Sequence, residues 1–320
     1  MTLTYLLPLR RDRVALEAGG ELVRYLTTIA GYVNVLIVDG SSPPLFARHS
    51  ELFAGVAEHI ALDPSDRCAN GKAWAVLTGL RRAHHDGVVI ADDDVRWDAM
   101  TLARAQTLLE GGDLVVPANY FAPMTWHAAW DTGRILLNRA LAHDWPGTLV
   151  VRRSALAATP RYDGDVLFEN CELVRTVAAS GGRVRVAPDL LVARRPPTVR
   201  HFLGQRPRQA YDDLAQPARM LAMLAIVPAA VLGGRRAVAA GALFSLAVAE
   251  AGRRAGGGRR VFPWYTSLGA PAWLGERAVL SWWVLCLRLS DRGVRYGDHR
   301  LLRAATPLAE LRARHGGGRV

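Results

Sequence analysis

The 320-residue sequence predicts an α/β protein with a mainly parallel sheet flanked by helices, followed by apolar C-terminal helices. Three observations predict this architecture. Short apolar runs alternate with helix-length amphipathic stretches up to about residue 190, three consecutive carboxylates end one apolar run, and the last third alternates apolar stretches with arginines. Because alternating strands and helices form a parallel sheet with covered faces, we divide the chain into an α/β domain at 1–215, apolar helices at 216–291 and a basic tail at 292–320.

The first elements form a strand–helix–strand unit. Residues 3–9 are a short apolar run closed by Pro8, and Arg10 lies in the basic loop that follows. A stretch with helical apolar spacing then leads to a second apolar run at 33–38, which ends in Asp39. The carboxyl ends of parallel strands meet at one edge of a sheet, so we expect a polar pocket above them.

The rest of the α/β domain continues this alternation. Further helices are predicted at 48–59, after Gly71, after Asp98, at 127–143 and from Glu169, and further strands at 87–91, 114–117, 148–151 and 183–187. Arg194 and Arg195 lie next to two prolines, a pattern that predicts a surface turn; the alternative is that they face a lipid phosphate.

The most informative motif is Asp92-Asp93-Asp94, which directly follows the strand predicted at 87–91. A strand core does not tolerate charge, and ligands bind at the carboxyl ends of strands in an open α/β sheet. Carboxylates at i and i+2 can both reach one hard cation, and Mg²⁺ or Mn²⁺ held in this way takes its other ligands from substrate phosphates. The alternative is a solvated acidic turn before the helix that Asp98 caps.

Lys72 is the only lysine in the chain. It follows Asn70 and Gly71 at the start of a predicted helix, where free backbone N–H groups and the positive end of the helix dipole favour anions. The motif therefore indicates a phosphate site, and the alternative is a solvated lysine in the first helical turn.

The net charge of +11 comes almost wholly from arginine, and the arginines are densest in the last third. A basic excess suits a nucleic acid, an anionic membrane surface or a phosphorylated substrate. The α/β part has no basic stripe interleaved with stacking aromatics, which argues against nucleic acid. Cys68, Cys171 and Cys286 lack metal-type spacing and indicate reduced thiols in a soluble part on the cytosolic side.

Three apolar segments, at 218–232, 237–249 and 278–289, follow the α/β domain. Each is shorter than the about 20 apolar residues of a full membrane span. Arginines occupy every connecting loop, so the positive-inside rule places none of these loops outside the cell. We therefore expect a shallow or tilted helical hairpin with a third interfacial or spanning helix. The alternative is a soluble cap of buried helices.

In this order the motifs resemble the family 2 glycosyltransferases, which are inverting enzymes with a nucleotide-sugar-binding GT-A fold. Asp39 resembles that family's nucleobase-contacting carboxylate, Asn70-Gly71-Lys72 resembles its N-x-G-K-type segment, and Asp92-Asp93-Asp94 matches its DxD motif. The resemblance implies a UDP- or GDP-sugar donor and a Mg²⁺ or Mn²⁺ ion held by Asp94 with Asp92. We assign donor binding to Pro8, Arg10, Asp39, Asn70, Gly71, Lys72, Asp92 and Asp93.

The acceptor side of the resemblance lies further along the chain. Glu169-Asn170-x-Glu172-Leu173 is similar to the family's ED-x-x-L segment, whose aspartate is the general base, but here that position is Asn170. An amide accepts no proton at neutral pH, so the base must be Glu169, Glu172 or a more distant acid such as Asp165, unless the acceptor needs little activation. Residues 205–209 resemble the Q-x-x-R-W motif, with glutamine in place of tryptophan. We assign the catalytic roles to Glu169, Asn170, Glu172, Gln205 and Arg208.

The pattern is most similar to integral-membrane members that act on lipids, such as the ceramide glucosyltransferase group. Those carry apolar helices after the Q-x-x-R segment and a basic Tyr/Arg-rich stretch after the last helix, as at residues 293–297 here. We expect an inverting glycosyltransferase of the cell membrane, with its catalytic domain on the cytoplasmic side and a lipid or lipid-linked acceptor. The alternatives are a soluble GT-A-type sugar or nucleotidyl transferase, and an inactive GT-A-fold binding protein.

Overall fold

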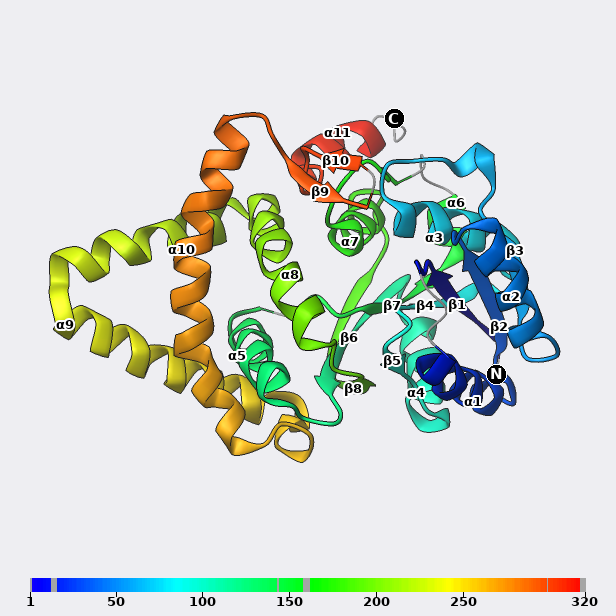
Figure 1. The fold of residues 1–320 in the computed structure, drawn as a ribbon, viewed down its shortest axis with the longest axis horizontal. Helices are drawn as coiled ribbons and strands as arrows, with labels where there is room; N and C mark the ends of the chain where they lie inside the picture. The colour runs from blue at the N-terminus through cyan, green and yellow to red at the C-terminus, as the bar shows by residue number, and fades with distance from the viewer. Residues whose placement is uncertain (1, 13–15, 143, 158–161, 298, 317–320) are drawn as a thin grey trace.

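The structure, a computed structural model, describes residues 2–12, 16–142, 144–157, 162–297 and 299–316. Its centre is an eight-stranded sheet with the order β3-β2-β1-β4-β7-β6-β8-β5 (Figure 1). The strands are β1 (Leu3–Leu9), β2 (Asn34–Asp39), β3 (Glu58–Ala61), β4 (Gly87–Ala91), β5 (Val95–Arg96), β6 (Leu114–Phe121), β7 (Thr148–Arg152) and β8 (Val184–Arg194). The first four strands of the sheet order pair in parallel, as do β6 and β8, whereas β7 is antiparallel to β4 and β6. The predicted α/β class with a mostly parallel sheet is confirmed.

Helices cover both faces of this sheet. In the α/β part they are α1 (Leu16–Ala30), α2 (Pro43–Phe53), α3 (Gly71–Arg82), α4 (Ala99–Glu110), α5 (Trp126–Leu141), α6 (Arg153–Ala157), α7 (Glu169–Ala179) and α8 (Val199–Tyr211). Neighbouring residues of β1 serve different cores: Tyr5 packs with α1 and α4, and Leu6 packs with α3 and α7. Side chains of a strand alternate between its faces, so a continuous apolar run buries both of them.

Capping residues position the starts of two helices near the carboxyl edge of the sheet. Asn70 caps α3, where its side-chain oxygen accepts hydrogen bonds from the backbone N–H groups of Lys72 (3.0 Å) and Ala73 (3.2 Å). Asp98 caps α4 through a capping box with Thr101. Both caps satisfy N–H groups that have no partner inside the helix, which holds the preceding loops in place.

Two predicted elements differ from the structure. The helix expected at 48–59 ends at Phe53, and the strand β3 follows it. Gly55 lies between them with a φ of +73°, a left-handed conformation that ends the helix. The strand expected at 183–187 runs on to Arg194, because its second half also pairs with β6 after a register shift. The surface turn predicted for Arg194 is therefore wrong.

The apolar C-terminal helices are α9 (Pro217–Arg254) and α10 (Gly269–Leu289). α9 joins two of the predicted apolar segments and kinks at Gly234, so that it projects from the molecule as a V whose open end α10 crosses (Figure 1). In the described part of the chain, one stretch, Pro217–Arg260, is long and apolar enough to cross a membrane, and almost none of its most apolar part is buried within the protein. Two of the three predicted segments thus form one longer helical feature.

Glycines let these helices dock closely on α5. A Cβ atom at Gly252 of α9 would lie 1.9 Å from the carbonyl oxygen of Leu136, and one at Gly133 of α5 would lie 2.5 Å from the carbonyl carbon of Gly269. Apolar side chains from α5, α9 and α10 share one core. This core joins the α/β part to the C-terminal helices across the boundary predicted at residue 215.

Residues after 291 fold back onto the α/β part. β9 (Val294–Tyr296) and β10 (His299–Leu301) form an antiparallel hairpin, and α11 (Leu308–Gly316) follows. The backbone N–H groups of Leu167 and Phe168 donate hydrogen bonds to the carbonyl oxygens of Arg303 (3.0 Å) and Ala304 (2.8 Å). The last part of the predicted basic tail, 317–320, lies outside the described residues. Residue 298 of the predicted tail also lies outside the described residues, and the described residues of that tail fold against the α/β part near the carboxyl edge of the sheet.

Candidate active site

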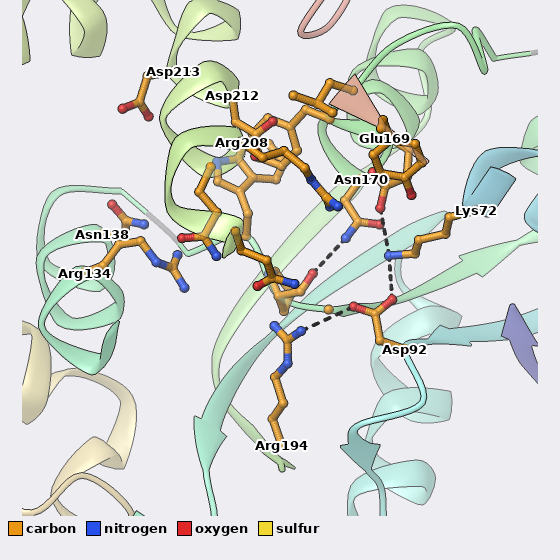
Figure 2. A pocket seen from close by; sticks show the side chains of 18 of the residues that line it. Lys72, Asp92, Arg134, Asn138, Glu169, Asn170, Arg194, Arg208, Asp212 and Asp213 are labelled. Atoms are coloured by element: carbon orange, nitrogen blue, oxygen red, sulfur yellow. Dashed lines mark hydrogen bonds and ion pairs between the residues drawn. The ribbon is translucent and has the colours of Figure 1, made fainter. Parts of the chain in front are cut away.

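A pocket of about 330 Å³ lies beyond the end of β4, with walls from α7, α8 and the β9–β10 hairpin (Figure 2). Its polar lining brings together segments that are far apart in the sequence. The lining includes Pro8, Lys72, Asp92, Asp93, Asp94, Gly147, Glu169, Asn170, Arg194, Gln205, Arg208, Asp212 and Tyr296. Nine of the residues that the sequence analysis assigned to donor, metal or catalytic roles therefore meet in one place.

Lys72 is held between two carboxylates in this pocket. Its ammonium nitrogen lies 2.7 Å from Asp92 Oδ1 and 2.7 Å from Glu169 Oε1. Burial opposes the charged form, but the two carboxylates outweigh it and raise the pKa of Lys72, so the ammonium stays charged. Burial acts to raise the pKa of Asp92, but the positive charge of Lys72 outweighs it, and the pKa of Asp92 is lowered. The predicted phosphate-facing lysine thus also links the end of β4 to α7.

Arg194 approaches the acidic triplet from the opposite side. Its Nε donates a hydrogen bond to Asp94 Oδ2 at 2.7 Å, and one terminal nitrogen lies 3.6 Å from Asp92 Oδ2. Asp93 points elsewhere and accepts a hydrogen bond from Arg11 at 2.8 Å. Figure 2 shows Lys72 and Arg194 on either side of Asp92. The triplet is a charge-paired site and not the solvated acidic turn of the alternative interpretation.

Gly147, in the turn before β7, permits this close arrangement. A Cβ atom there would lie 2.5 Å from Asp92 Oδ2 and 3.2 Å from the guanidinium carbon of Arg194. The carbonyl oxygen of Gly147 accepts a hydrogen bond from the backbone N–H of Asp92 at 2.9 Å. The close approach of backbone and side chains therefore requires glycine at this position.

Asp94 is the residue that best fits a divalent cation. Its Oδ1 atom is buried without a hydrogen-bond partner, so one carboxylate oxygen lacks the compensation that a cation supplies. Burial raises the pKa of Asp94; Arg194 opposes this shift and Asp92 adds to it. In the described part of the chain, no three His, Cys, Asp or Glu side chains converge as a metal cage. The donor set suits an ion that completes its coordination with substrate phosphates.

The three polar positions at the start of α7 have different surroundings. Glu169 faces Lys72 in the pocket, and Asn170 lines the pocket while its amide donates to the carbonyl oxygen of Pro146 at 2.9 Å. Glu172 is fully buried, and its Oε2 accepts a hydrogen bond from the backbone N–H of Thr306 at 2.6 Å. Because Glu172 does not reach the pocket, its assignment as a base is corrected: it anchors the C-terminal segment.

Asp212 is an acid of the pocket that the sequence analysis missed. It begins a 3₁₀ turn, η2 (Asp212–Ala215), directly after α8, and lies on the same side of the pocket as Arg208 (Figure 2). Its Oδ1 atom is buried without a hydrogen-bond partner. Burial raises the pKa of Asp212 to about 7, although Arg208 opposes the shift. The available signal was its place four residues after Arg208, which puts both side chains on one helix face.

α8 presents its polar motif to two different environments. Gln205 and Arg208 line the pocket, whereas Arg206 points away and donates to Asp131 at 2.7 Å and Glu276 at 2.6 Å. The guanidinium carbon of Arg208 lies 4.7 Å from the ring centroid of Tyr296 in β9. Tyr296 belongs to the predicted tail, so only the folded hairpin reveals its place in the pocket.

Asp39 differs from its predicted role. Its side chain is fully buried, with Oδ2 2.6 Å from His49 Nδ1 and 3.1 Å from His59 Nε2, and Oδ1 accepts from the backbone N–H of Ser41 at 2.8 Å. Burial opposes ionisation, but the hydrogen bonds from His59, Ser41 and His49 hold the pKa of Asp39 well below its usual range. With both oxygens engaged, the predicted nucleobase contact is corrected to a structural link between β2, α2 and β3.

Four further predicted positions lie outside the pocket lining. Asn70 is fully buried, caps α3 and donates to the carbonyl oxygen of Val166 at 2.9 Å, so a direct donor contact is corrected to a structural role. Gly71 is the first residue of α3 and directly precedes Lys72. Asp165 accepts a hydrogen bond from the backbone N–H of Ala69 at 2.7 Å. Arg10 lines a neighbouring groove.

Comparisons with known proteins identify the architecture. A mannosyltransferase from Pyrobaculum calidifontis, solved in complex with GDP-Man and Mn²⁺, is 21% identical, with 88% of this chain and 87% of that chain covered and a TM-score of 0.52. The chain has the GT-A fold. Two further similar structures have TM-scores below 0.5. They are glucosyl-3-phosphoglycerate synthase from Mycobacterium tuberculosis (20% identical, 65% of this chain and 76% of that chain covered, TM-score 0.43) and TarS from S. aureus (15% identical, 70% and 67% covered, TM-score 0.44). No protein-family model and no curated protein sequence matches this GT-A chain.

Proposed function

We propose that this GT-A chain is an inverting glycosyltransferase that moves a sugar from a UDP- or GDP-sugar to a lipid or lipid-linked acceptor at the cytosolic face of the cell membrane. One observation carries the proposal. Asp92 and Asp94 meet Lys72 and Arg194 at the end of β4, in a pocket that Glu169 and Asp212 also line. A glycosyl transfer uses this combination, because cations stabilise the leaving diphosphate and an acid–base group serves the acceptor.

On the donor side, the leaving group is a nucleoside diphosphate whose negative charge grows as its bond to the anomeric carbon breaks. Lys72, Arg194 and Arg208 line the pocket and place positive charge where this diphosphate would lie. Asp94, with Asp92, would hold a Mg²⁺ or Mn²⁺ ion, which when bound adds Lewis-acid stabilisation of the same charge. The existing ion pairs orient these side chains before the donor arrives, which lowers the cost of binding.

On the acceptor side, a hydroxyl oxygen attacks the anomeric carbon, the bond to the nucleoside diphosphate breaks, and the hydroxyl proton passes to a base. We assign this role to Asp212 in preference to Glu169. Glu169 is paired with Lys72 at 2.7 Å, whereas Asp212 Oδ1 has no hydrogen-bond partner. The pKa of Asp212, raised by burial to about 7, also suits proton acceptance near neutral pH.

The lipid acceptor and the membrane location are inferred from the C-terminal helices. Val231 and Leu232, near the kink of α9, are 76% and 88% exposed, and Trp282 and Trp283 of α10 are each 42% exposed. Exposed apolar helix surface with tryptophans beside it is typical of contact with a membrane interface. The arginines between the apolar segments, including Arg235 and Arg236 at the α9 kink, favour the cytosolic side.

The proposal is tested by release of nucleoside diphosphate from a panel of UDP- and GDP-sugars. The full chain is assayed in membranes, with lipid extract as the acceptor, with and without Mg²⁺ or Mn²⁺. Metal-dependent release that requires the lipid supports the proposal and identifies the donor. Release that needs neither lipid nor membrane would instead favour a soluble transferase, and Asp94→Ala provides the inactive control.

Asn170 favours a second candidate, a GT-A-fold binding protein without turnover. The family that the motifs resemble has its base at this position, and the amide found here is engaged with Pro146 at 2.9 Å. Metal-dependent binding of UDP or GDP, with no release from any sugar donor, would select this candidate over the transferase.

A further inference from the structure

A groove of about 1440 Å³ lies outside the pocket. Its walls come from α8, the C-terminal half of α10, the β9–β10 hairpin and the loop after β1. His201, Gln205, Arg208 and Tyr296 line both the pocket and the groove, so the two spaces are continuous. A ligand in the groove would therefore lie beside the proposed site of transfer.

Arginines dominate the lining of this groove. They are Arg10, Arg200, Arg208, Arg292, Arg295 and Arg300, against one acid, Asp12. Among the described residues, the five from Arg200 onward make no ion pair with a carboxylate. Arg295 and Arg300 donate instead to backbone carbonyl oxygens, at 3.3 Å and 2.9 Å. These contacts orient the guanidinium groups without neutralising their charge. The groove therefore keeps positive charge that can bind an anion.

Apolar side chains of α10 line the same groove. Trp283 and Leu287 contribute to its wall, and Trp283 is 42% exposed. An alkyl chain would cover these side chains and gain the free energy of removing them from water. A free nucleotide or phosphate would leave them exposed, and a neutral lipid would leave the arginines without counter-charge. The combination therefore fits an anionic amphiphile.

We propose that this groove binds the phosphate or diphosphate headgroup of the lipid acceptor, with the alkyl chain leaving over Trp283 and Leu287 toward the C-terminal helices. The inference rests on the proposed function and narrows its acceptor to lipids whose headgroup carries both a phosphate and a hydroxyl. The hydroxyl oxygen forms the new bond to the anomeric carbon, its proton passes to Asp212, and the nucleoside diphosphate departs. The headgroup phosphate is held by guanidinium groups and changes no bond.

The test compares three probes by titration calorimetry with the full chain in detergent: dioctanoyl phosphatidic acid, dioctanoylglycerol and inorganic phosphate. Phosphatidic acid alone supplies both a phosphate and alkyl chains. We therefore expect it to bind at least about 10-fold more tightly than either of the other probes. The same measurement on variants then locates the site.

The informative variant is Arg200→Gln with Arg292→Gln. Both residues line the groove, and neither guanidinium makes a hydrogen bond among the described residues, so the fold should persist. This variant is expected to weaken phosphatidic acid binding about 10-fold. Arg235→Gln with Arg236→Gln is the matched control, because it removes the same charge from exposed positions at the α9 kink and should leave binding within about twofold.

Three results would overturn the inference. Equal affinity for phosphatidic acid and dioctanoylglycerol would show that the groove does not bind the phosphate. Equal weakening of phosphatidic acid binding by both double variants would show that only general charge attraction is involved. Weaker UDP or GDP binding in Arg200→Gln with Arg292→Gln, with phosphatidic acid binding unchanged, would assign the groove to the donor. Tight phosphatidic acid binding in a chain that releases no nucleoside diphosphate would refute the proposed function while keeping the groove assignment.

Discussion

At the scale of single residues, charges of opposite sign alternate from Glu169 through Lys72, Asp92 and Arg194 to Asp94. Each cation contacts two carboxylates, so the loss of one carboxylate leaves its cation with another partner. Single substitutions in this series should therefore alter ligand binding more than they alter the fold. The acid Asp212 makes no ion pair among the described residues, which leaves it available to exchange a proton.

The pH dependence of turnover tests the role of Asp212. Groups facing it are Arg208 from α8, Glu169 from α7, Arg277 from α10 and its neighbour Asp213, and burial raises its pKa to about 7. Because the base must be deprotonated, kcat/KM should rise with pH and level off above about 7. Asp212→Asn should lower kcat about 10²–10⁴-fold and remove this pH dependence, as measured by nucleoside diphosphate release.

Asp213→Asn is the control for that experiment. The carboxylate of Asp213 lies 3.0 Å from Arg219 and 3.2 Å from Arg277, so this neighbouring substitution should lower the melting temperature and keep the acidic limb of the profile. Full activity of Asp212→Asn, or an unchanged acidic limb, would return the role of base to Glu169.

Asp94→Asn tests the metal site without changing side-chain size. The variant should lose the part of UDP or GDP affinity that depends on Mg²⁺ or Mn²⁺, because its buried unpartnered oxygen no longer carries charge. Titration calorimetry with and without the metal measures this difference. Asp93→Asn is the matched variant: Asp93 pairs with Arg11 at 2.8 Å, and its loss should preserve the metal dependence. The reverse pattern would move the metal from Asp94 to Asp93.

Gly147→Ala tests the close approach at the end of β4. The added Cβ would lie 2.5 Å from Asp92 Oδ2, so the carboxylate and Arg194 must move, and UDP or GDP binding should weaken about 10-fold. Gly241→Ala is the matched control, since a Cβ there meets nothing within 4 Å in α9, and it should stabilise the helix by roughly 0.5–1 kcal/mol. Unchanged nucleotide binding in Gly147→Ala would contradict the role given to this glycine.

At the scale of elements, the pocket depends on segments that join the sheet late in the chain. β8 carries Arg194 to the acidic triplet, α8 supplies Arg208, and the β9–β10 hairpin places Tyr296 against that arginine. The segment that follows the hairpin is held by Glu172, whose buried carboxylate accepts a hydrogen bond from the backbone N–H of Thr306. The C-terminal segment is therefore part of the site.

Removal of residues 292–320 should abolish nucleoside diphosphate release and lower the melting temperature, because it strips one wall of the pocket and the partner of Glu172. Tyr296→Ala is the milder companion variant. It should keep the fold and reduce transfer, since Arg208 loses the ring that lies 4.7 Å from its guanidinium carbon. Wild-type activity of both proteins would restore the view of this region as a separate tail.

At the scale of the whole molecule, an α/β body and a projecting apolar V share one core through α5 (Figure 1). The arginine-lined groove is bounded by Trp283 and Leu287 of α10 and shares lining residues with the pocket. A membrane bound by the V, as proposed, would lie next to α10, which crosses the open end of the V and contributes Trp283 and Leu287 to the groove. The proposed acceptor groove and the proposed site of sugar transfer are therefore adjacent.

Leu232→Asp with Leu243→Asp tests the membrane contact. These side chains are 88% and 68% exposed on α9, and a charge at the membrane centre costs about 2.5–3.5 kcal/mol, so binding to phosphatidylcholine vesicles should fall at least about 10-fold. Co-sedimentation measures this loss. Met100→Asp, at a position 78% exposed on α4, is the control and should bind as the wild type does. Equal binding by all three proteins would contradict membrane contact through α9.

Much of the fold and part of the site could be predicted from sequence, because these features depend on residues close together in the chain. Apolar runs mark the central strands, Asn70 marks the start of α3, and the acidic triplet marks the end of β4. Sequence patterns do not predict the length of a strand where pairing with a strand distant in the chain decides it. The second half of β8 follows Pro188 and ends in Arg194, and its pairing with β6 and β5 makes it a strand.

The sequence by itself determined the α/β architecture, the single lysine at a helix start and three carboxylates at a strand end, since helix and strand periods are local properties. The tertiary structure alone decided which polar groups meet. Asp39 is buried between two histidines, and Arg194 contacts Asp94, which is 100 positions earlier in the chain. Asp212 lines the pocket. Those outcomes depend on the packing of separate elements, and no local pattern specifies that packing.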